Sequence, residues 1–166
     1  NTPAIERDFP LGSMQANYTW LELNERFDQL RNLYPDIISD RLIIGESLEG
    51  HDIWAFKLSD NPDQDENEPQ VLYTGLTHAR EPLSMMNLFY FIQNICENYV
   101  AGNDSEATYL VNERELWFIP VVNPDGYIYN ELIAPDGGGM HRKNRRDTGC
   151  GSGTEKGVDI NRNYGF

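Results

Sequence analysis

The chain has 166 residues, of which 39% are hydrophobic and 11% aromatic, enough to build the core of one ordinary domain. Its formal net charge of −14 argues against a nucleic-acid partner, because phosphate binding depends on clustered lysine and arginine. The sequence contains no run of about 18 apolar residues, so neither a membrane-spanning segment nor a membrane partner is expected.

The first predicted element is an amphipathic helix in residues 18–36, "YTWLELNERFDQLRNLYPD". Thr19 and Glu22 have the spacing of a capping box, in which each side chain binds the backbone N–H of the other residue. Apolar side chains then recur at helical spacing until Pro35, which marks the end of the helix.

An antiparallel hairpin is predicted next. Residues 41–46 and 51–58 have the composition of two short strands, and the glycine-bearing segment 47–50 between them favours a tight turn. His51 begins the second strand, where a surface or edge histidine is expected. The polar and acidic segment 60–69 is predicted to be a loop, too short to be a linker between domains.

The middle of the chain predicts a strand, a helix, a short helix and a second strand. The two strands are the apolar runs 70–76 and 115–122, both expected to be buried, and the helices are 82–100 and 105–112. Cys96 lies on the apolar face of the longer helix and is expected to be a small core residue. A strand, crossover and strand imply a parallel pair, so the fold class is α/β, with a mixed, mostly parallel sheet flanked by helices and an N-terminal antiparallel hairpin.

The last part of the chain is dominated by turn-forming residues. "NPDG" at 123–126 predicts a turn, and the glycine-rich and charged segment 134–157 predicts a long loop, which in a compact domain is usually functional. Its basic cluster, "HRKNRR" at 141–146, is either a solvated loop or part of a site. Residues 157–166, "GVDINRNYGF", predict a short extended segment.

His78 and Glu81 are the first candidate site residues. They follow the 70–76 strand, and ligands of open α/β sheets bind outside the carboxyl ends of the strands. An imidazole and a carboxylate three residues apart can converge on one cation, and two histidines with one glutamate are a known zinc set. Taken alone, this spacing also occurs by chance, so a polar turn remains the alternative.

Two further motifs favour a catalytic site. The basic run "RKNRR" at 142–146 supplies guanidinium groups suited to bidentate carboxylate recognition or to stabilising an oxyanion. Asn161 and Arg162, in "NRN", add an amide and a further guanidinium group. A metal with arginines beside it, in an acidic protein, describes a site where an anionic substrate is hydrolysed by a metal-activated water.

Four motifs resemble those of a known family. "THAREP", "PVVNPDGY", "RKNRR" and "GVDINRNYGF", in that order, resemble the zinc metallocarboxypeptidases of the carboxypeptidase A and T type, and the helix and hairpin at 18–58 resemble the start of the same domain. The resemblance implies a partial zinc-carboxypeptidase fold with a zinc ion (Zn²⁺). It implies that His78 and Glu81 are zinc ligands and that Arg142 polarises the scissile carbonyl.

The resemblance also assigns the substrate side. It implies that Asn161 and Arg162 hold the free C-terminal carboxylate of a peptide, and that Arg80 lines a more remote substrate subsite. The "NPDG" turn is expected to support the site. His141 falls directly before the carbonyl-polarising arginine and is expected to be a neighbour of the site, not a zinc ligand.

In the family, the third zinc ligand, the covering tyrosine, the specificity pocket and the general-base glutamate follow the "NRN" motif. We therefore expect residues 1–17 to be an N-terminal extension and residues 18–166 to be the amino-terminal portion of a single catalytic domain, truncated after that motif. The missing carboxy-terminal half is the expected partner, and this chain alone is expected to be inactive.

The expected function is thus that of a metallocarboxypeptidase fragment, whose parent removes C-terminal residues from peptides. The alternatives are a zinc amidohydrolase of the aspartoacylase or succinylglutamate desuccinylase type, which also uses a histidine and glutamate at this spacing, and a non-catalytic binding module. "NPDGY" with "GVDINRN" favours the peptidase. An acidic chain that begins in mid-sequence fits an extracellular or periplasmic peptidase.

Overall fold

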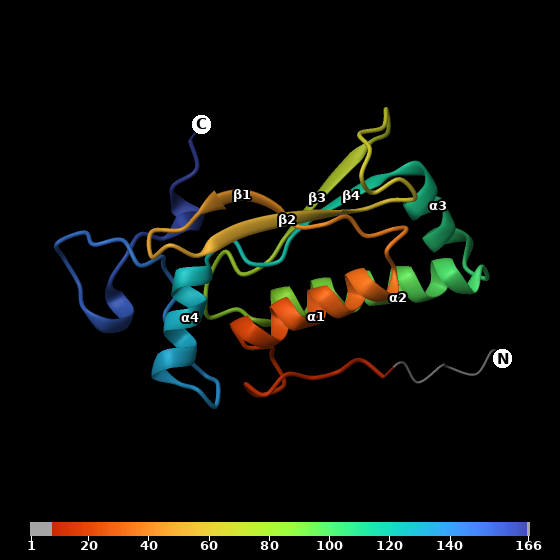
Figure 1. Cartoon of the computed structure of the whole chain (residues 1–166). Helices are drawn as coiled ribbons and strands as arrows, with labels where there is room; N and C mark the ends of the chain where they lie inside the picture. Colours follow the sequence, from red (N-terminus) through yellow and green to blue (C-terminus); the bar gives the residue numbers. More distant parts are fainter. Residues whose placement is uncertain (1–7, 166) are drawn as a thin grey trace.

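The computed structural model of the chain describes residues 8–165 and begins with the expected amphipathic helix (Figure 1). This helix, α1 (Trp20–Leu33), has a complete capping box: the Thr19 side chain accepts a hydrogen bond from the backbone N–H of Glu22, and the Glu22 carboxylate accepts one from that of Thr19. The predicted helix and its cap are confirmed.

The predicted hairpin follows. β1 (Leu42–Glu46) and β2 (Asp52–Leu58) pair antiparallel, with a shift of register within the pairing. The ring of Phe27, on α1, lies 5.0 Å from that of Trp54 and 4.8 Å from that of Phe56, measured between centroids. These aromatic contacts hold α1 against β2, since ring pairs at such distances contribute beyond the area they bury.

A parallel pair of strands completes the sheet. β3 (Gln70–Thr74) leads into α2 (Leu83–Ala101) and α3 (Ser105–Glu113), and the chain returns as β4 (Glu115–Ile119), parallel to β3. β4 also pairs antiparallel with β2, which gives the order β1-β2-β4-β3. The α/β class and the mixed sheet are confirmed, and among the described strands two of the three pairings are antiparallel.

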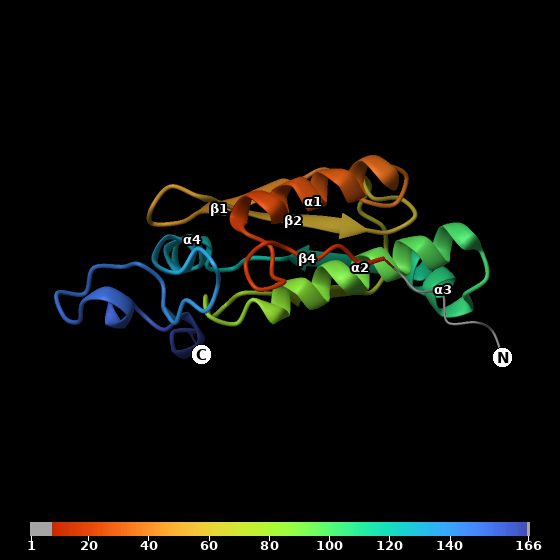
Figure 2. The ribbon, with the colours of Figure 1, turned by 90° about the horizontal axis from the view of Figure 1, so that it is seen from below.

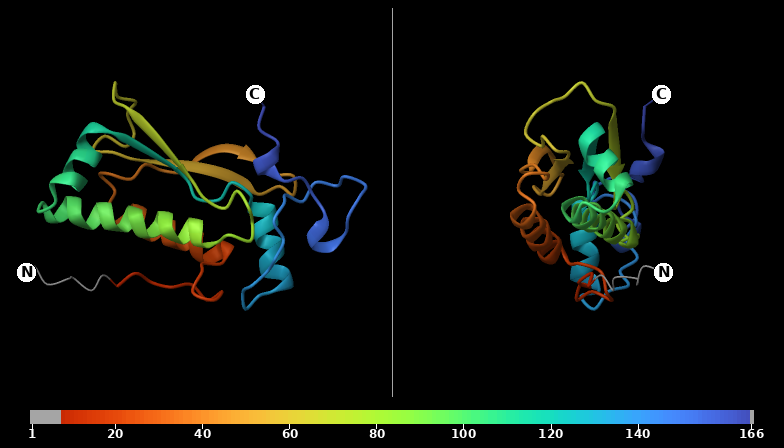
Figure 3. Two further views of the ribbon diagram at one scale, coloured as in Figure 1. Left: turned by 180° about the vertical axis from the view of Figure 1, so that it is seen from behind. Right: turned by 90° about the vertical axis from the view of Figure 1, so that its right-hand side faces the viewer.

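The helices α1 and α2 lie side by side on one face of the sheet (Figures 1 and 2), and the view along them shows both on the same side (Figure 3). β4 is buried as predicted, because it lies between β2 and β3 and its Leu116 and Phe118 are fully covered. The prediction of a buried strand at 70–76 is wrong for the described residues. β3 is an edge strand there, and Leu72 is 60% exposed.

The predicted turn at 123–126 is the start of a helix, α4 (Pro124–Ile133), which stands at the end of the sheet (Figure 1). The Asn123 side chain accepts a hydrogen bond from the backbone N–H of Gly126 and so caps the helix, with Pro124 in its first turn. Asparagine, proline and glycine favour turns and helix starts alike, so the prediction of a simple turn was wrong.

Beyond α4 the chain has little regular structure, as expected of a long loop. It contains two short 3₁₀ helices, η1 (Gly153–Glu155) and η2 (Ile160–Arg162). The prediction of an extended segment at 157–166 is wrong over 160–162, and Phe166 lies outside the described residues. The reason is local: the Asp159 side chain accepts a hydrogen bond from the backbone N–H of Asn161 and caps a helical turn.

A buried ion pair crosses the sheet under the acidic loop. The Lys57 ammonium lies 2.7 Å from the Glu115 carboxylate, and both side chains are almost fully buried. The same carboxylate accepts hydrogen bonds from the backbone N–H of Glu66 and from the Gln70 amide, at 3.0 and 2.6 Å. Its negative charge is therefore well compensated.

Two remaining expectations concern Cys96 and the N-terminal extension. Cys96 is fully buried on α2, which confirms it as a core residue, whereas Cys150 is exposed and both are free thiols. Of the predicted extension 1–17, residues 1–7 lie outside the described part, and Met14 packs in the core; the domain boundary stays a prediction. None of the helices within residues 8–165 has the length and apolar character needed to cross a bilayer.

Candidate metal and substrate site

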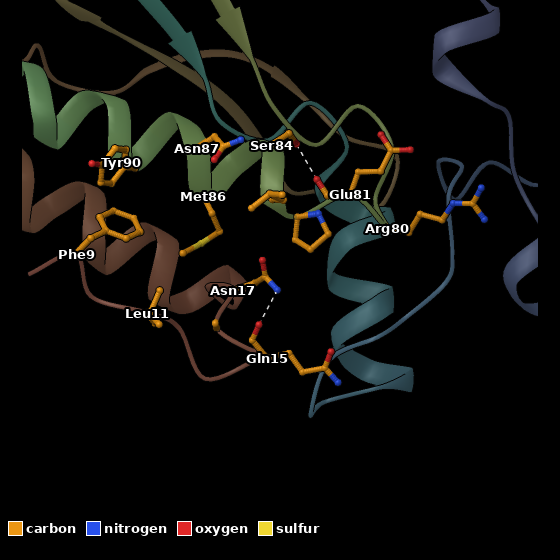
Figure 4. A pocket seen from close by; sticks show the side chains of 13 residues that line it. Phe9, Leu11, Gln15, Asn17, Arg80, Glu81, Ser84, Met86, Asn87 and Tyr90 are labelled. Carbon is orange, nitrogen blue, oxygen red and sulfur yellow. Dashed lines mark hydrogen bonds between the residues drawn. The ribbon is translucent and has the colours of Figure 1, made fainter.

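His78 and Glu81 lie in a tight turn just beyond the carboxyl end of β3. The backbone N–H of Glu81 donates to the His78 carbonyl at 3.1 Å, which brings the two side chains to the same side. The Ser84 hydroxyl donates to the Glu81 carbonyl at 2.8 Å and accepts from the N–H of Leu76 at 2.9 Å, so the turn is fixed at both ends (Figure 4). As a result, Nδ1 of His78 lies 3.0 Å from both carboxylate oxygens of Glu81.

This arrangement fits a zinc ion. Ligand bonds of about 2.0–2.2 Å in a tetrahedral shell place neighbouring donor atoms roughly 3.3 Å apart, close to the observed distance. Nε2 of His78 lies 3.2 Å from the Asp159 carboxylate. When Nε2 donates its proton to Asp159, Nδ1 and the Glu81 carboxylate present electron pairs toward one position, which a cation satisfies.

The described residues supply two metal ligands to that position, His78 and Glu81. Asp159 contacts the opposite ring nitrogen of His78, so it orients the ring and is not itself a ligand. Within residues 8–165 no group of three or more histidine, cysteine, aspartate or glutamate side chains is arranged to hold a metal ion. The pair therefore fits zinc as a partial ligand set.

Arg142 lies beside this pair. Its Nε donates to Asp159 at 3.0 Å and one terminal nitrogen donates to Glu81 at 3.4 Å. Burial alone would raise the pKa of Asp159, but the hydrogen bond and positive charge of Arg142, followed by those of His78, lower it below its ordinary value. The lowered pKa keeps Asp159 negatively charged, which favours the proton on Nε2 of His78.

Asp159 is a candidate site residue that was not predicted from the sequence. It contacts both His78 and Arg142 and, as the cap of η2, also fixes the start of the "NRN" segment. A signal was available: an aspartate two residues before Asn161, in a motif beside a candidate metal site, is the kind of carboxylate that orients a histidine ligand.

The predicted substrate residues lie on the surface of the described structure. Asn161 and Arg162 are exposed, and Arg162 donates to the backbone carbonyl of Asn161 at 3.0 Å. Arg80 is exposed and its guanidinium group points away from the Glu81 carboxylate, at one end of an open hollow of about 780 Å³ between α2 and the N-terminal segment (Figure 4). The roles of these three residues stay predictions.

The other two histidines are structural. His141 is fully buried, its Nδ1 and Nε2 lie 3.1 and 3.2 Å from the backbone carbonyl oxygens of Thr154 and Asn144, and burial lowers its pKa. This fits the expected neighbour of the site that is not a ligand. His51 is half-buried, with Nδ1 2.9 Å from the buried carboxylate of Asp125, so it links the hairpin turn to α4.

Comparison with known proteins gives a consistent result. A family model described as zinc carboxypeptidase matches residues 23–166. The chain is 38% identical, over 96% of its length and 35% of the relative's, to a zinc carboxypeptidase of Saccharothrix mutabilis subsp. capreolus. It is 33% identical, over 74% of its length and 20% of the relative's, to an inactive metallocarboxypeptidase, ecm14, of Talaromyces marneffei.

Among solved structures, the carboxypeptidase A of Helicoverpa armigera superposes on 92% of this chain and 35% of its own, with a TM-score of 0.71 and 27% identity. The likeness supports the α/β fold over nearly the whole described chain. The chain thus spans about a third or less of the length of these three relatives.

Proposed function

Because the chain belongs to the zinc carboxypeptidase family, we propose that the protein carrying it is a zinc-dependent metallocarboxypeptidase that hydrolyses the C-terminal peptide bond of peptides. The family expected from the four motifs is confirmed. The membership favours a peptidase over the alternative amidohydrolase that cleaves acyl groups from amino acids.

The observation that carries the proposal is the convergence of His78 and Glu81, with Nδ1 3.0 Å from the carboxylate, and the contact of Asp159 with the other ring nitrogen. These two residues would hold the zinc ion together with a ligand from outside the described residues. Zinc, when bound, supplies a Lewis acid that polarises a carbonyl and lowers the pKa of a bound water. Asp159 holds the ring of His78 in the orientation and tautomer that this requires.

The arginines act on the substrate. Arg142 adjoins the ligand pair and would stabilise the negative charge that develops on the scissile carbonyl oxygen, giving up its long contact with Glu81. Asn161 and Arg162 would bind the free C-terminal carboxylate, which a guanidinium group recognises in bidentate fashion. Arg80, on the outer side of the same turn, would contact the substrate further from the scissile bond.

The proposal includes the setting of the activity. The substrate is a peptide with a free C-terminus, the carboxy-terminal remainder of the domain completes the site, and the place of action is extracellular or periplasmic. Neither a nucleic acid nor a membrane is a partner.

A non-catalytic protein is the second candidate, because one relative is described as an inactive metallocarboxypeptidase. That description belongs to the relative and not to this chain. This chain retains the ligand pair, its orienting aspartate and Arg142, which favours catalysis.

The test uses the full-length protein that carries this sequence. Release of C-terminal residues from a mixed set of peptides is followed with zinc present, after chelation, and after zinc is restored. We expect release that is abolished by the chelator and restored by zinc, and abolished by His78→Ala. Peptides with an amidated C-terminus serve as the control and should be cleaved poorly.

Two results would reject the proposal. Release that persists in His78→Ala or under chelation would place the chemistry elsewhere. A full-length protein that binds zinc but hydrolyses none of the peptides would support the non-catalytic candidate.

A further inference from the structure

One face of α4 contacts both segments that carry the site. The turn with His78 and the loop segment with Arg142 touch directly through one backbone hydrogen bond, from the N–H of Ala79 to the carbonyl of Arg142 at 3.1 Å, and through the contact of the Arg142 side chain with Glu81 at 3.4 Å. The backbone bond fixes one distance, and the second contact is long and joins the ends of two side chains, one of them 53% exposed. Their relative position therefore depends on what packs against both.

Asn130 supplies that contact. Its side-chain amide donates to the carbonyl of Ala79 at 3.0 Å and to the carbonyl of His141 at 2.8 Å, and its oxygen accepts from the N–H of His141 at 2.8 Å. The residue is only 3% exposed. Both donors and the acceptor of one buried amide are thus used to join the residue after His78 to the residue before Arg142.

The chain packs closely around the Asn130 amide. A Cβ added to Gly139 would lie 2.6 Å from the Cβ of Asn130, and one added to Gly126, a turn earlier on α4, would lie 2.6 Å from the carbonyl oxygen of Lys143. Glycine at both positions allows α4 to approach the two segments closely. The Asn123 amide adds a further hydrogen bond, to the carbonyl of Lys143 at 2.9 Å.

We propose that Asn130 is a positioning residue, which sets Arg142 relative to His78 and Glu81 and thereby controls the rate of peptide hydrolysis. The inference rests on the proposed function. The chemistry of the amide is specific: an aspartate has no donor for the two carbonyl groups, and an aliphatic side chain leaves three buried backbone groups without a partner. Displacement of Arg142 by about 1 Å would cost roughly 100-fold in rate.

The test compares Asn130→Ala with Val111→Ala in the full-length protein. Val111 is fully buried on α3, at the other end of the sheet from α4, so its truncation destabilises the fold without touching the site (Figure 1). For Asn130→Ala we expect kcat to fall about 10- to 100-fold with KM little changed, since the lost interaction acts on the transition state. Val111→Ala should keep kcat.

Two further measurements and one conservative variant separate positioning from general destabilisation. Hydrogen–deuterium exchange should show faster exchange in segments 77–81 and 141–143 of Asn130→Ala only. In a background of Arg142→Ala, the effect of Asn130→Ala on kcat should largely vanish, because the group that it positions is gone. Asn130→Ser, which keeps one hydroxyl donor and acceptor, should fold better and give an intermediate loss of kcat.

The outcomes are distinguishable. Unchanged kcat in Asn130→Ala and Asn130→Ser, or losses that stay fully additive with Arg142→Ala, would overturn the inference. If the unsubstituted protein hydrolyses no peptide, the proposed function fails independently of Asn130. In that case hydrogen–deuterium exchange still tests the inference: unchanged exchange of segments 77–81 and 141–143 in Asn130→Ala would show that Asn130 does not hold them together.

Discussion

Replacement of Asp159 by asparagine should weaken zinc binding and catalysis without unfolding the protein. One carboxylate oxygen of Asp159 faces Nε2 of His78 at 3.2 Å and the other faces Nε of Arg142 at 3.0 Å, and both partners are donors when Nε2 carries the proton. In Asp159→Asn, the amide oxygen still accepts a hydrogen bond from one of these donors, but the N–H₂ group faces the other donor and cannot accept. One charge-assisted hydrogen bond, worth about 1.5–3 kcal/mol, is therefore lost.

That loss translates into a measurable change. About 1.4–2.7 kcal/mol corresponds to a 10- to 100-fold change in an equilibrium or rate constant, which is also the usual effect of altering the partner of a metal-binding histidine. The assay is competition for zinc between a chelator and the full-length Asp159→Asn protein, together with its kcat/KM. Asp147→Asn is the matched control, because Asp147 is exposed and its Lys156 partner is 3.9 Å away.

The control should retain both the zinc affinity and the kcat/KM of the unsubstituted protein. If Asp159→Asn also retained both within twofold, Asp159 would not orient His78, and the assignment of Nε2 as the proton-bearing nitrogen would be wrong.

Three further outcomes are expected. Lys57→Met should lower the free energy of unfolding by about 3–5 kcal/mol, because it leaves the buried carboxylate of Glu115 without its cation, and Lys57→Met with Glu115→Leu should recover most of the loss in denaturant titrations. Gly126→Ala should cost about 1–3 kcal/mol by the same measurement, because its methyl group would meet the carbonyl of Lys143, and Gly126→Ser should be no better. Burial raises the pKa of Glu131 in the folded state, so the folded protein loses stability as the pH rises from the unfolded pKa of this carboxyl group through its folded pKa. Glu131→Gln should therefore raise the melting temperature at neutral pH and leave it unchanged at pH values below the unfolded pKa. The reverse pH dependence would contradict this.

Local signals were sufficient for the first half of the fold. The capping box at Thr19 and the helical spacing after it are properties of neighbouring residues, and so is the turn between β1 and β2. Burial was harder to predict, because it depends on partners distant in the sequence. The composition of β3 suits a buried strand, yet its exposure is set by its position at the edge of the described sheet.

The arrangement of the candidate site followed from the sequence only in part. His78 and Glu81 have the side chains and spacing of a ligand pair and lie together, and Arg142, which the family resemblance pointed to, lies beside them. Their roles stay predictions. Asp159 and Asn130 were not predicted, because their importance comes from the partners that they touch 81 and 51 residues away. No local pattern distinguishes an asparagine that joins two segments from one that faces solvent.

The edge position of β3 has a consequence for handling the chain in isolation. Its backbone groups on the outer side have no strand partner among the described residues, and Val71 and Leu72 are 37% and 60% exposed there. Such an edge is a template for pairing with a second chain. The net charge of −14 keeps copies apart at low ionic strength, and added salt, by screening that repulsion, should promote ordered aggregation through this strand.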